Sequence, residues 1–178
     1  MPTKKASQMR LYKTKIPNVA ALIVERLVKD EDIEVSNVQE ANLDIEAVLN
    51  EFLRLDREIT EEAKDKLEHR GLSYSSFGRV KRDLAEKRGI GAGEEAISWI
   101  CNQVLETFMH SPHVEEVFAE DTVMRKKLKE ILRTAMAVES ELDEEVRKRI
   151  KNIKEGTDAW DIEYTNKMND IRRKHGLD

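Results

Sequence analysis

The densest group of chemistry-bearing side chains lies in residues 110–121, which read HSPHVEEVFAED. His110, His113, Glu115 and Glu116 belong to this segment, and imidazole and carboxylate groups suit Zn, Mn or Fe. The spacing, however, matches neither the i, i+4 histidine pair of a helical zinc site nor a Glu-x-x-His pair. We therefore expect a helix end followed by a short Pro-started helical turn, with both glutamates in its first turn. In that arrangement the four residues form part of an interaction surface, and no metal is assigned to them.

Two basic segments offer a different chemistry, which is contact with the phosphates of a nucleic acid. The first includes an aromatic residue that can stack on a base. Acidic residues interrupt nearly every basic run, as on an ordinary exposed helix with i, i+4 ion pairs. A solvated helix face is therefore the preferred interpretation, and RNA binding is the alternative. The residues concerned are Tyr74, Arg79, Lys81 and Arg82 in the first segment, and Arg147, Lys148, Arg149 and Lys151 in the second, which extends to Lys154.

The sequence contains no recognisable catalytic group. Cys101 falls on the apolar stripe of a predicted helix, so it is expected to be a small buried hydrophobe. Trp160 falls on an inward stripe and is expected in the core. Trp99 lies beside such a stripe and is a candidate anchor for a partner, because tryptophan is common at interfaces. No catalytic residue and no cofactor is therefore assigned.

The composition indicates what kind of protein carries these segments. Of the 178 residues, 38% are charged and 5% are aromatic, with 7 Gly and 3 Pro, which favours long helices over sandwiches and barrels. The net charge of -5 gives no general attraction to nucleic acids or membranes, and the single Cys excludes an internal disulfide framework. The longest apolar run, Val19–Val24, is too short to span a membrane. We expect a cytoplasmic protein without a membrane partner.

Apolar residues recur at helical spacing along most of the chain, which predicts an all-α fold. The longest stripe runs from Ile45 to Leu67 and predicts one long helix. A capping box at Ser36 and Gln39 is expected to open that helix, and Gly71 is expected to close it. Other side chains expected to face inward are Val19 and Leu22 in the helix that begins near Pro17, and Ile131 and Ala135 in the helix that follows Asp121.

The order of these elements repeats along the chain. Ile59–Leu67 aligns with Leu142–Ile150, and Arg88-Gly89-Ile90 aligns with His175-Gly176-Leu177. We therefore predict an internally duplicated helical bundle made of two similar units that a Gly-rich hinge joins. The predicted organisation is a mobile tail and lead-in segment at residues 1–15, a first unit at 16–90, the hinge at 91–96 and a second unit at 97–178.

Several segments of the chain resemble a known bacterial family. They are MRLYKTKIP at residues 9–17, LDIEAVLNEFLR at 43–54, HRGLSYSSFGRVKR at 69–82, HSPHVEEVFAED at 110–121 and GTDAWDIEY at 156–164. On these motifs the chain resembles the family known as domain of unknown function 507, from residue 9 to the C-terminus. The resemblance implies a bacterial, cytoplasmic, helical protein and supplies no catalytic residue.

These features predict a non-enzymatic protein that presents helix faces to a protein or nucleoprotein partner. Long amphipathic helices are also compatible with a homodimer. RNA binding through the basic segments is the first alternative. A metal-dependent enzyme at His110 and His113 is the second.

Overall fold

The computed structural model describes residues 9–137 and 140–175, so the tail predicted at residues 1–8 lies outside the described residues. The described part is mostly helical, at 75% helix, with one small two-stranded sheet, β1 (Ile33–Val35) and β2 (Val114–Val117). This confirms the prediction of a helical fold. The helices are α1 (Ile16–Lys29), α2 (Val38–Arg70), α3 (Phe77–Lys87), α4 (Glu94–His110), α5 (Asp121–Met136), α6 (Ser140–Arg149) and α7 (Asp158–Lys174), with short 3-10 turns at Lys13–Lys15 and Tyr74–Ser76.

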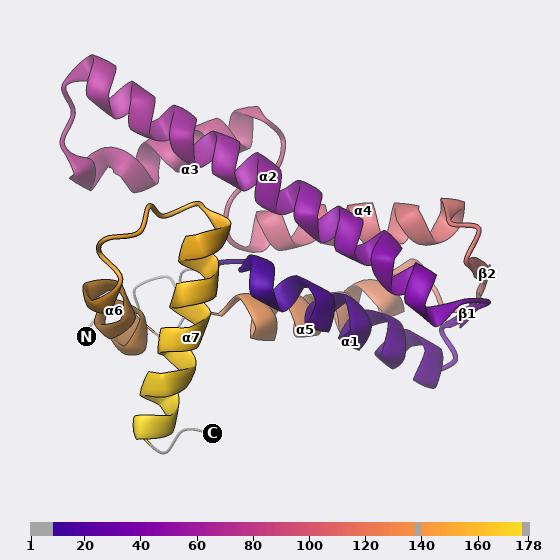
Figure 1. Ribbon diagram of the computed structural model, residues 1–178. Coiled ribbons are helices and arrows are strands. Elements are labelled where there is room, and N and C mark those ends of the chain that lie inside the picture. The colour runs from indigo at the N-terminus through magenta and orange to yellow at the C-terminus, as the bar shows by residue number, and fades with distance from the viewer. Residues whose placement is uncertain (1–8, 138–139, 176–178) are drawn as a thin grey trace, which may run out of the picture.

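Four helices form the body of the molecule. α1 and α4 each pack against both α2 and α5. Their facing stripes bury Ile23, Leu49, Ile100 and Leu128 completely. Each such side chain contributes about 1.5–3 kcal/mol through its burial. The second half of α2 extends beyond this body and carries α3, while α6 and α7 form a separate hairpin, the α6–α7 hairpin, near the same end (Figure 1).

The two strands close the opposite end of the body. They pair antiparallel, with Ile33 opposite Val117 and Val35 opposite Val114. The expectation of a helical turn after Pro112 is therefore wrong, because this segment forms β2. Its local signals favour a helix start, but the Val-Glu-Glu-Val segment pairs with β1 through backbone hydrogen bonds. Because β1 is distant in sequence, local patterns do not reveal this partner.

The predicted long helix is confirmed as α2, which runs for 33 residues. Ile45, Ile59 and Leu67 are buried along one face, as the spacing of apolar residues predicted. Gly71 adopts φ 61°, the left-handed conformation that glycine accepts at a helix end. The capping residue is Asn37, whose side chain accepts a hydrogen bond from the Glu40 amide, so the prediction of Ser36 as the cap is wrong by one position.

The α6–α7 hairpin has a small core of its own. Val146, Ile150, Trp160 and Ile171 are buried there, which confirms the core position predicted for Trp160. The Thr157 hydroxyl caps α7 by accepting a hydrogen bond from the Trp160 amide. Tyr12, which precedes α1 in the chain, is buried in the same core.

The glycine-rich segment lies between α3 and α4. Gly89, Gly91 and Gly93 all adopt positive φ, a backbone conformation that glycine accepts without strain. Ile90, between two of these glycines, is buried in the core of the body. Within residues 9–137 and 140–175, no helix combines the length and the apolar character required to cross a bilayer.

Candidate functional site

The segment before α1 joins the body to the α6–α7 hairpin. The Arg10 amide donates a hydrogen bond of 2.8 Å to the Met136 carbonyl at the end of α5. Leu11 is buried in the body, whereas the next residue, Tyr12, is buried in the hairpin. The backbone at Tyr12 is extended, so successive side chains point to opposite sides. Residues 9–15, named here the strap, therefore belong to both cores.

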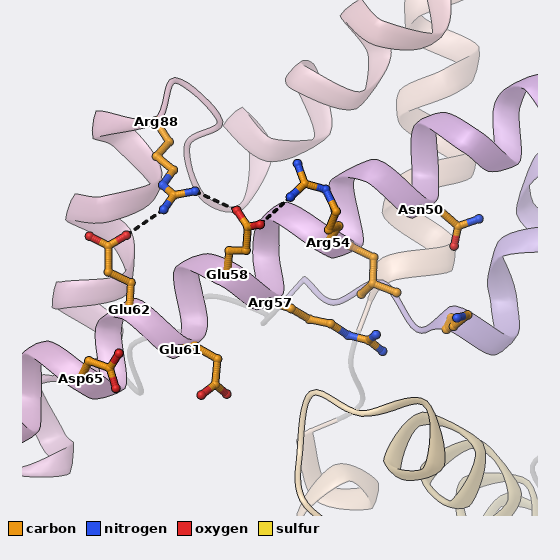
Figure 2. Close-up of a pocket in the computed structure, with 10 residues that line it drawn as sticks. Asn50, Arg54, Arg57, Glu58, Glu61, Glu62, Asp65 and Arg88 are labelled. Carbon is orange, nitrogen blue, oxygen red and sulfur yellow. Dashed lines mark hydrogen bonds and ion pairs between the residues drawn. The ribbon is translucent and has the colours of Figure 1, made fainter.

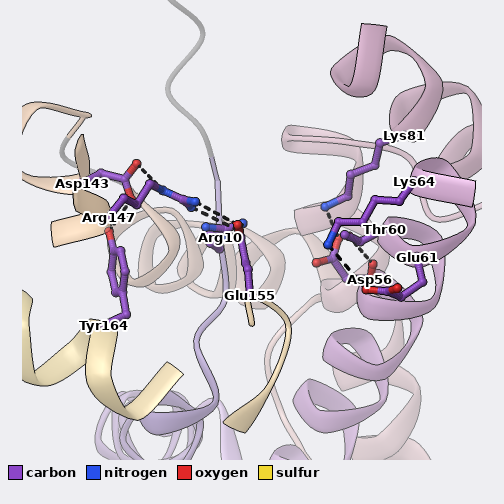
Figure 3. A network of polar contacts seen from close by, with 10 residues as sticks. All are labelled: Arg10, Asp56, Thr60, Glu61, Lys64, Lys81, Asp143, Arg147, Glu155 and Tyr164. Atoms are coloured by element: carbon purple, nitrogen blue, oxygen red, sulfur yellow. Dashed lines mark hydrogen bonds and ion pairs between the residues drawn. The ribbon is translucent and has the colours of Figure 1, made fainter. Parts of the chain in front are cut away.

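Ion pairs reinforce the strap on one side (Figure 3). Glu155 accepts hydrogen bonds from Arg10 and from Arg147 of α6, the latter at 3.0 Å. Arg147 also donates to Asp143 at 2.9 Å, and the Tyr164 hydroxyl donates to the same carboxylate at 2.6 Å. Arg147 was predicted as a phosphate contact, but its guanidinium is bonded here to two carboxylates, Asp143 on the same helix and Glu155 in the loop between α6 and α7.

Aromatic rings continue this network. Tyr12, Trp160 and Tyr164 stack on one another, and the guanidinium carbons of Arg10 and Arg147 lie 5.3 and 5.2 Å from the Trp160 ring centroid. Burial raises the pKa of Tyr12 to about 12. Burial raises the pKa of Tyr164 as well, and the hydrogen bond to Asp143 adds to the effect. Both hydroxyls therefore stay protonated at neutral pH.

A second set of polar contacts holds the start of α7 against α2. Arg57 of α2 donates to Asp158 and to Asp161, both at 3.0 Å. The Lys13 ammonium pairs with Asp158 at 2.7 Å, and the Lys13 amide donates to Asp161. Hydrogen bonds from Lys13 and Arg57 lower the pKa of Asp158, whereas burial raises the pKa of Asp161. These contacts hold the hairpin against α2. The two cations and the two carboxylates neutralise one another, so no net charge remains at the contact.

The other basic residues that were predicted to contact nucleic-acid phosphates divide into two groups. Lys81 pairs with Asp56 at 3.0 Å and Arg149 pairs with Glu145 at 3.1 Å, so both cations are partly neutralised. The other four are exposed and have no ion pair within the part of the chain that the structure describes. They are Arg79 and Arg82 on α3, Lys148 at the end of α6, and Lys151 in the loop that follows it.

The exposed cations of α3 lie next to an aromatic pair. Tyr74 is 71% exposed and stacks on Phe77, with ring centroids 5.3 Å apart and planes within 5°. Residues 69–82 contain three arginines and one lysine and no carboxylate. This segment, named here the basic tip, comprises the last two residues of α2, the turn between α2 and α3, and the first half of α3. It combines the stacking and cationic groups that a nucleic-acid surface needs.

The predicted His and Glu group lies around the two-stranded sheet. His110 is exposed at the end of α4, and Glu115 and Glu116 are exposed in β2. His113 is half-buried, and its Nε2 lies 3.9 Å from Glu40 on α2. Nowhere in residues 9–137 and 140–175 do three or more His, Cys, Asp or Glu side chains form a group able to hold a metal ion.

The two other residues singled out in the sequence lie on α4. Trp99 is half-buried and packs against Phe52, with ring centroids 6.0 Å apart. Part of its surface therefore remains accessible beside the body. Cys101 is fully buried, as predicted, and burial raises the pKa of its thiol. A buried, protonated thiol is a poor nucleophile.

A groove of about 890 Å³ follows the surface of α2 (Figure 2). Its charges are arranged in pairs. Arg54 bonds Glu51 and Glu58, and Arg88 bonds Glu58 at 3.1 Å and Glu62 at 2.9 Å. The pairing with Glu62 and Glu58 raises the pKa of Arg88. These contacts tie the end of α3 to α2, so the groove presents a balanced surface rather than a charged site.

A second groove, of about 600 Å³, lies between α1 and α5 and was not foreseen from the sequence. Its apolar lining is Val19, Leu22, Ile131 and Ala135. All four were predicted to face inward, yet Leu22 is 44% exposed and Ile131 and Ala135 are only half-buried. The helical spacing was correct, but these side chains line a surface groove and are only partly covered. We name it the α1–α5 groove.

Comparison with known proteins gives one family match. A search of curated proteins finds no match to the chain. The model of the family described as "Protein of unknown function (DUF507)" matches residues 9–177, nearly the whole chain. The matched region begins at the strap, and it includes both the α6–α7 hairpin and the body. The chain therefore belongs to the DUF507 family.

Proposed function

We propose that this protein is a non-enzymatic, cytoplasmic interaction protein that binds an amphipathic helix of a partner protein in the α1–α5 groove. One observation supports the proposal. Apolar side chains that helical periodicity assigns to the core, Leu22 above all, remain accessible along an open groove between two packed helices. A partner helix that lays its apolar face into such a groove would complete the burial.

The rim of the groove suits a helix with charges of both signs. Arg26 and Lys29 line it together with Glu25 and Glu130. Charges at the rim of a binding site contribute little to binding affinity, but they orient the partner and disfavour proteins with a mismatched charge pattern. The apolar floor would supply most of the binding free energy, at roughly 25 cal/mol per Å² removed from water.

The test compares one groove variant with a matched surface variant. Leu22→Glu introduces a charge into the groove, whereas Leu43→Glu introduces the same charge on α2 at a leucine that is 55% exposed. Tagged proteins are used for capture from the lysate after RNase treatment, followed by chemical cross-linking. A partner that is kept by wild type and Leu43→Glu, is lost with Leu22→Glu and cross-links to Lys29 supports the proposal.

Two results would contradict this assignment. If the same proteins are recovered with Leu22→Glu as with wild type, the groove is not the binding site. If the cross-linked partner is a second copy of this chain, and the mass in sedimentation halves with Leu22→Glu, the groove is a homodimer interface instead.

RNA binding is the second candidate function, and one observation favours it. The basic tip has four cations without a carboxylate in its sequence, and its exposed Tyr74–Phe77 stack offers an aromatic platform. The second segment, around Arg147, supports RNA binding less, because Asp143, Glu155 and Glu145 neutralise two of its cations.

A gel-shift assay with single-stranded RNA over a salt series tests the RNA candidate. Each phosphate contact contributes about 0.7 to the slope of log affinity against log salt. Arg79→Gln and Arg82→Gln are each expected to lower that slope by about this amount. Lys126→Gln, an exposed lysine on α5, serves as the control. A slope that is unchanged in both arginine variants would remove the basic tip from consideration.

We also infer that the chain is internally duplicated, with residues 91–96 as the link between its units. Each half runs in the order helix, strand, long helical stretch and returning helix, with α5 and α6 corresponding to the continuous α2. The antiparallel pairing of β1 with β2 is what a pseudo-twofold relation predicts. An alignment of family sequences tests this, because profiles of the two halves should match each other better than profiles of unrelated helices do.

A further inference from the structure

A third groove lies where α3, the glycine-rich loop and the strap meet, and it shares Phe77, Gly78, Lys81 and Arg82 with the basic tip. Its volume is about 260 Å³. The floor is apolar and includes Phe52, Ile59, Phe77 and Met136. Pockets for drug-sized ligands typically reach about 300–1,000 Å³, so this one suits a smaller molecule. We name it the α3 groove.

The polar rim of the α3 groove is cationic. Arg10, Lys81 and Arg82 line it, against the single carboxylate of Asp56. That carboxylate is bonded to Lys81, as Figure 3 shows. Arg82 has no ion pair among the described residues, whereas the Arg10 guanidinium is bonded to Glu155. An anionic group in the groove would therefore receive its charge-assisted hydrogen bond from Arg82, which is exposed and lines the groove.

We propose that the α3 groove binds a small amphipathic anion, with an aliphatic body on the apolar floor and a carboxylate or phosphate head at the cationic rim. The cations at the rim favour a negatively charged head group on the ligand, and the apolar floor favours an aliphatic body. Residues 1–8 do not suit the groove as an occupant, because they carry two lysines and no carboxylate. The rim would repel them.

Gly78 provides a clean way to block the groove. It lies on α3 and lines the groove, and a Cβ built at this position would meet no heavy atom within 4 Å. Gly78→Leu therefore places its Cβ in open space beside the groove, and it raises helix propensity. Glu86→Leu is the matched control, because it adds the same side chain at an exposed α3 position outside the groove.

The experiment uses the full-length protein and octanoate, octyl phosphate and 1-octanol as probes, with amide chemical shifts as the readout. Octanoate or octyl phosphate is expected to shift the amides of Gly78 and Gly91–Gly93. The stronger of the two identifies the head group. Arg82→Gln should weaken that probe about tenfold, the loss expected for one charged hydrogen bond. Gly78→Leu should abolish the shifts, and Glu86→Leu should leave them unchanged.

Three outcomes would overturn the proposal. The first is the absence of shifts at the groove amides with either anion. The second is binding of 1-octanol as strong as that of the anions, because the cationic rim would then have no role. The third is binding that persists in Gly78→Leu. Thermal unfolding of each variant confirms that the fold is retained.

Discussion

The ring of Tyr12 stacks on the ring of Tyr164, with centroids 4.5 Å apart and 15° between the two planes. These residues come from opposite ends of the described chain. Leu11, immediately before Tyr12, is buried in the body. One dipeptide thus contributes to both cores, and the position of the α6–α7 hairpin depends on the strap.

Truncation of Tyr12 is expected to release the hairpin selectively. Tyr12→Ala removes a buried ring from the small core, and replacing a buried aromatic by alanine typically costs about 3–5 kcal/mol. Hydrogen exchange should therefore accelerate in α6 and α7 more than in α4. Leu11→Ala is the control, because its loss should affect the body first. Equal acceleration in α4 and α7 after Tyr12→Ala would contradict a role specific to the hairpin.

Removal of the Glu155 charge is expected to weaken the hydrogen bonds that Arg10 and Arg147 donate to this side chain. Glu155→Gln keeps the shape of the side chain but loses the charge between Arg10 and Arg147. The free energy of unfolding should fall by about 1–3 kcal/mol in chemical denaturation. Glu144→Gln, at an exposed position of α6, should change it by less than about 0.5 kcal/mol. Similar values for the two variants would show that the pair contributes little.

Helical periodicity was sufficient to predict most of the fold. It identified α2 and its C-terminal glycine, because a regular stripe and a left-handed glycine are local signals. It could not identify β1 and β2, since each strand is stabilised by the other across a long stretch of sequence. The capping position was missed by one residue because Ser36 and Asn37 are both good caps.

Surface sites were harder to predict than the core. Composition alone did not distinguish Arg147, whose charge is neutralised by carboxylates, from Arg79, which has no ion pair among the described residues. The difference depends on which helices come together. Leu22 was assigned to the core because periodicity gives the direction of a side chain and not whether another helix covers it. The strap has no periodicity, so its role in joining two cores left no signal in the sequence.

Alkaline pH is expected to destabilise the hairpin through its tyrosines. The pKa of Tyr12 is raised from 10.0 to about 12 in the folded protein, whereas the unfolded chain ionises at the ordinary value. Between these two values the unfolded state releases the proton and the folded state retains it, so stability falls as the pH rises. Melting temperatures from pH 9 to about 12 should decline less steeply in Tyr12→Phe than in wild type. Identical pH profiles would show that Tyr12 does not contribute to this decline.

The start of α2 offers a test of which residue caps the long helix. Asn37 accepts the hydrogen bond from the Glu40 amide at 3.1 Å, whereas the Ser36 hydroxyl makes a longer contact of 3.3 Å with the His113 carbonyl. Asn37→Ala is therefore expected to lower the free energy of unfolding by about 1 kcal/mol, the usual cost of a lost cap. Ser36→Ala should lower it by less than about 0.5 kcal/mol, because its contact is exposed. Chemical denaturation of the two variants measures these changes. A larger loss of unfolding free energy in Ser36→Ala than in Asn37→Ala would show that Ser36 is the capping residue. The β1–β2 ribbon ends beside this cap, where Val35 lies opposite Val114 and the Ser36 amide donates to the His113 carbonyl. Exchange of the Ser36 amide should therefore also increase in Asn37→Ala.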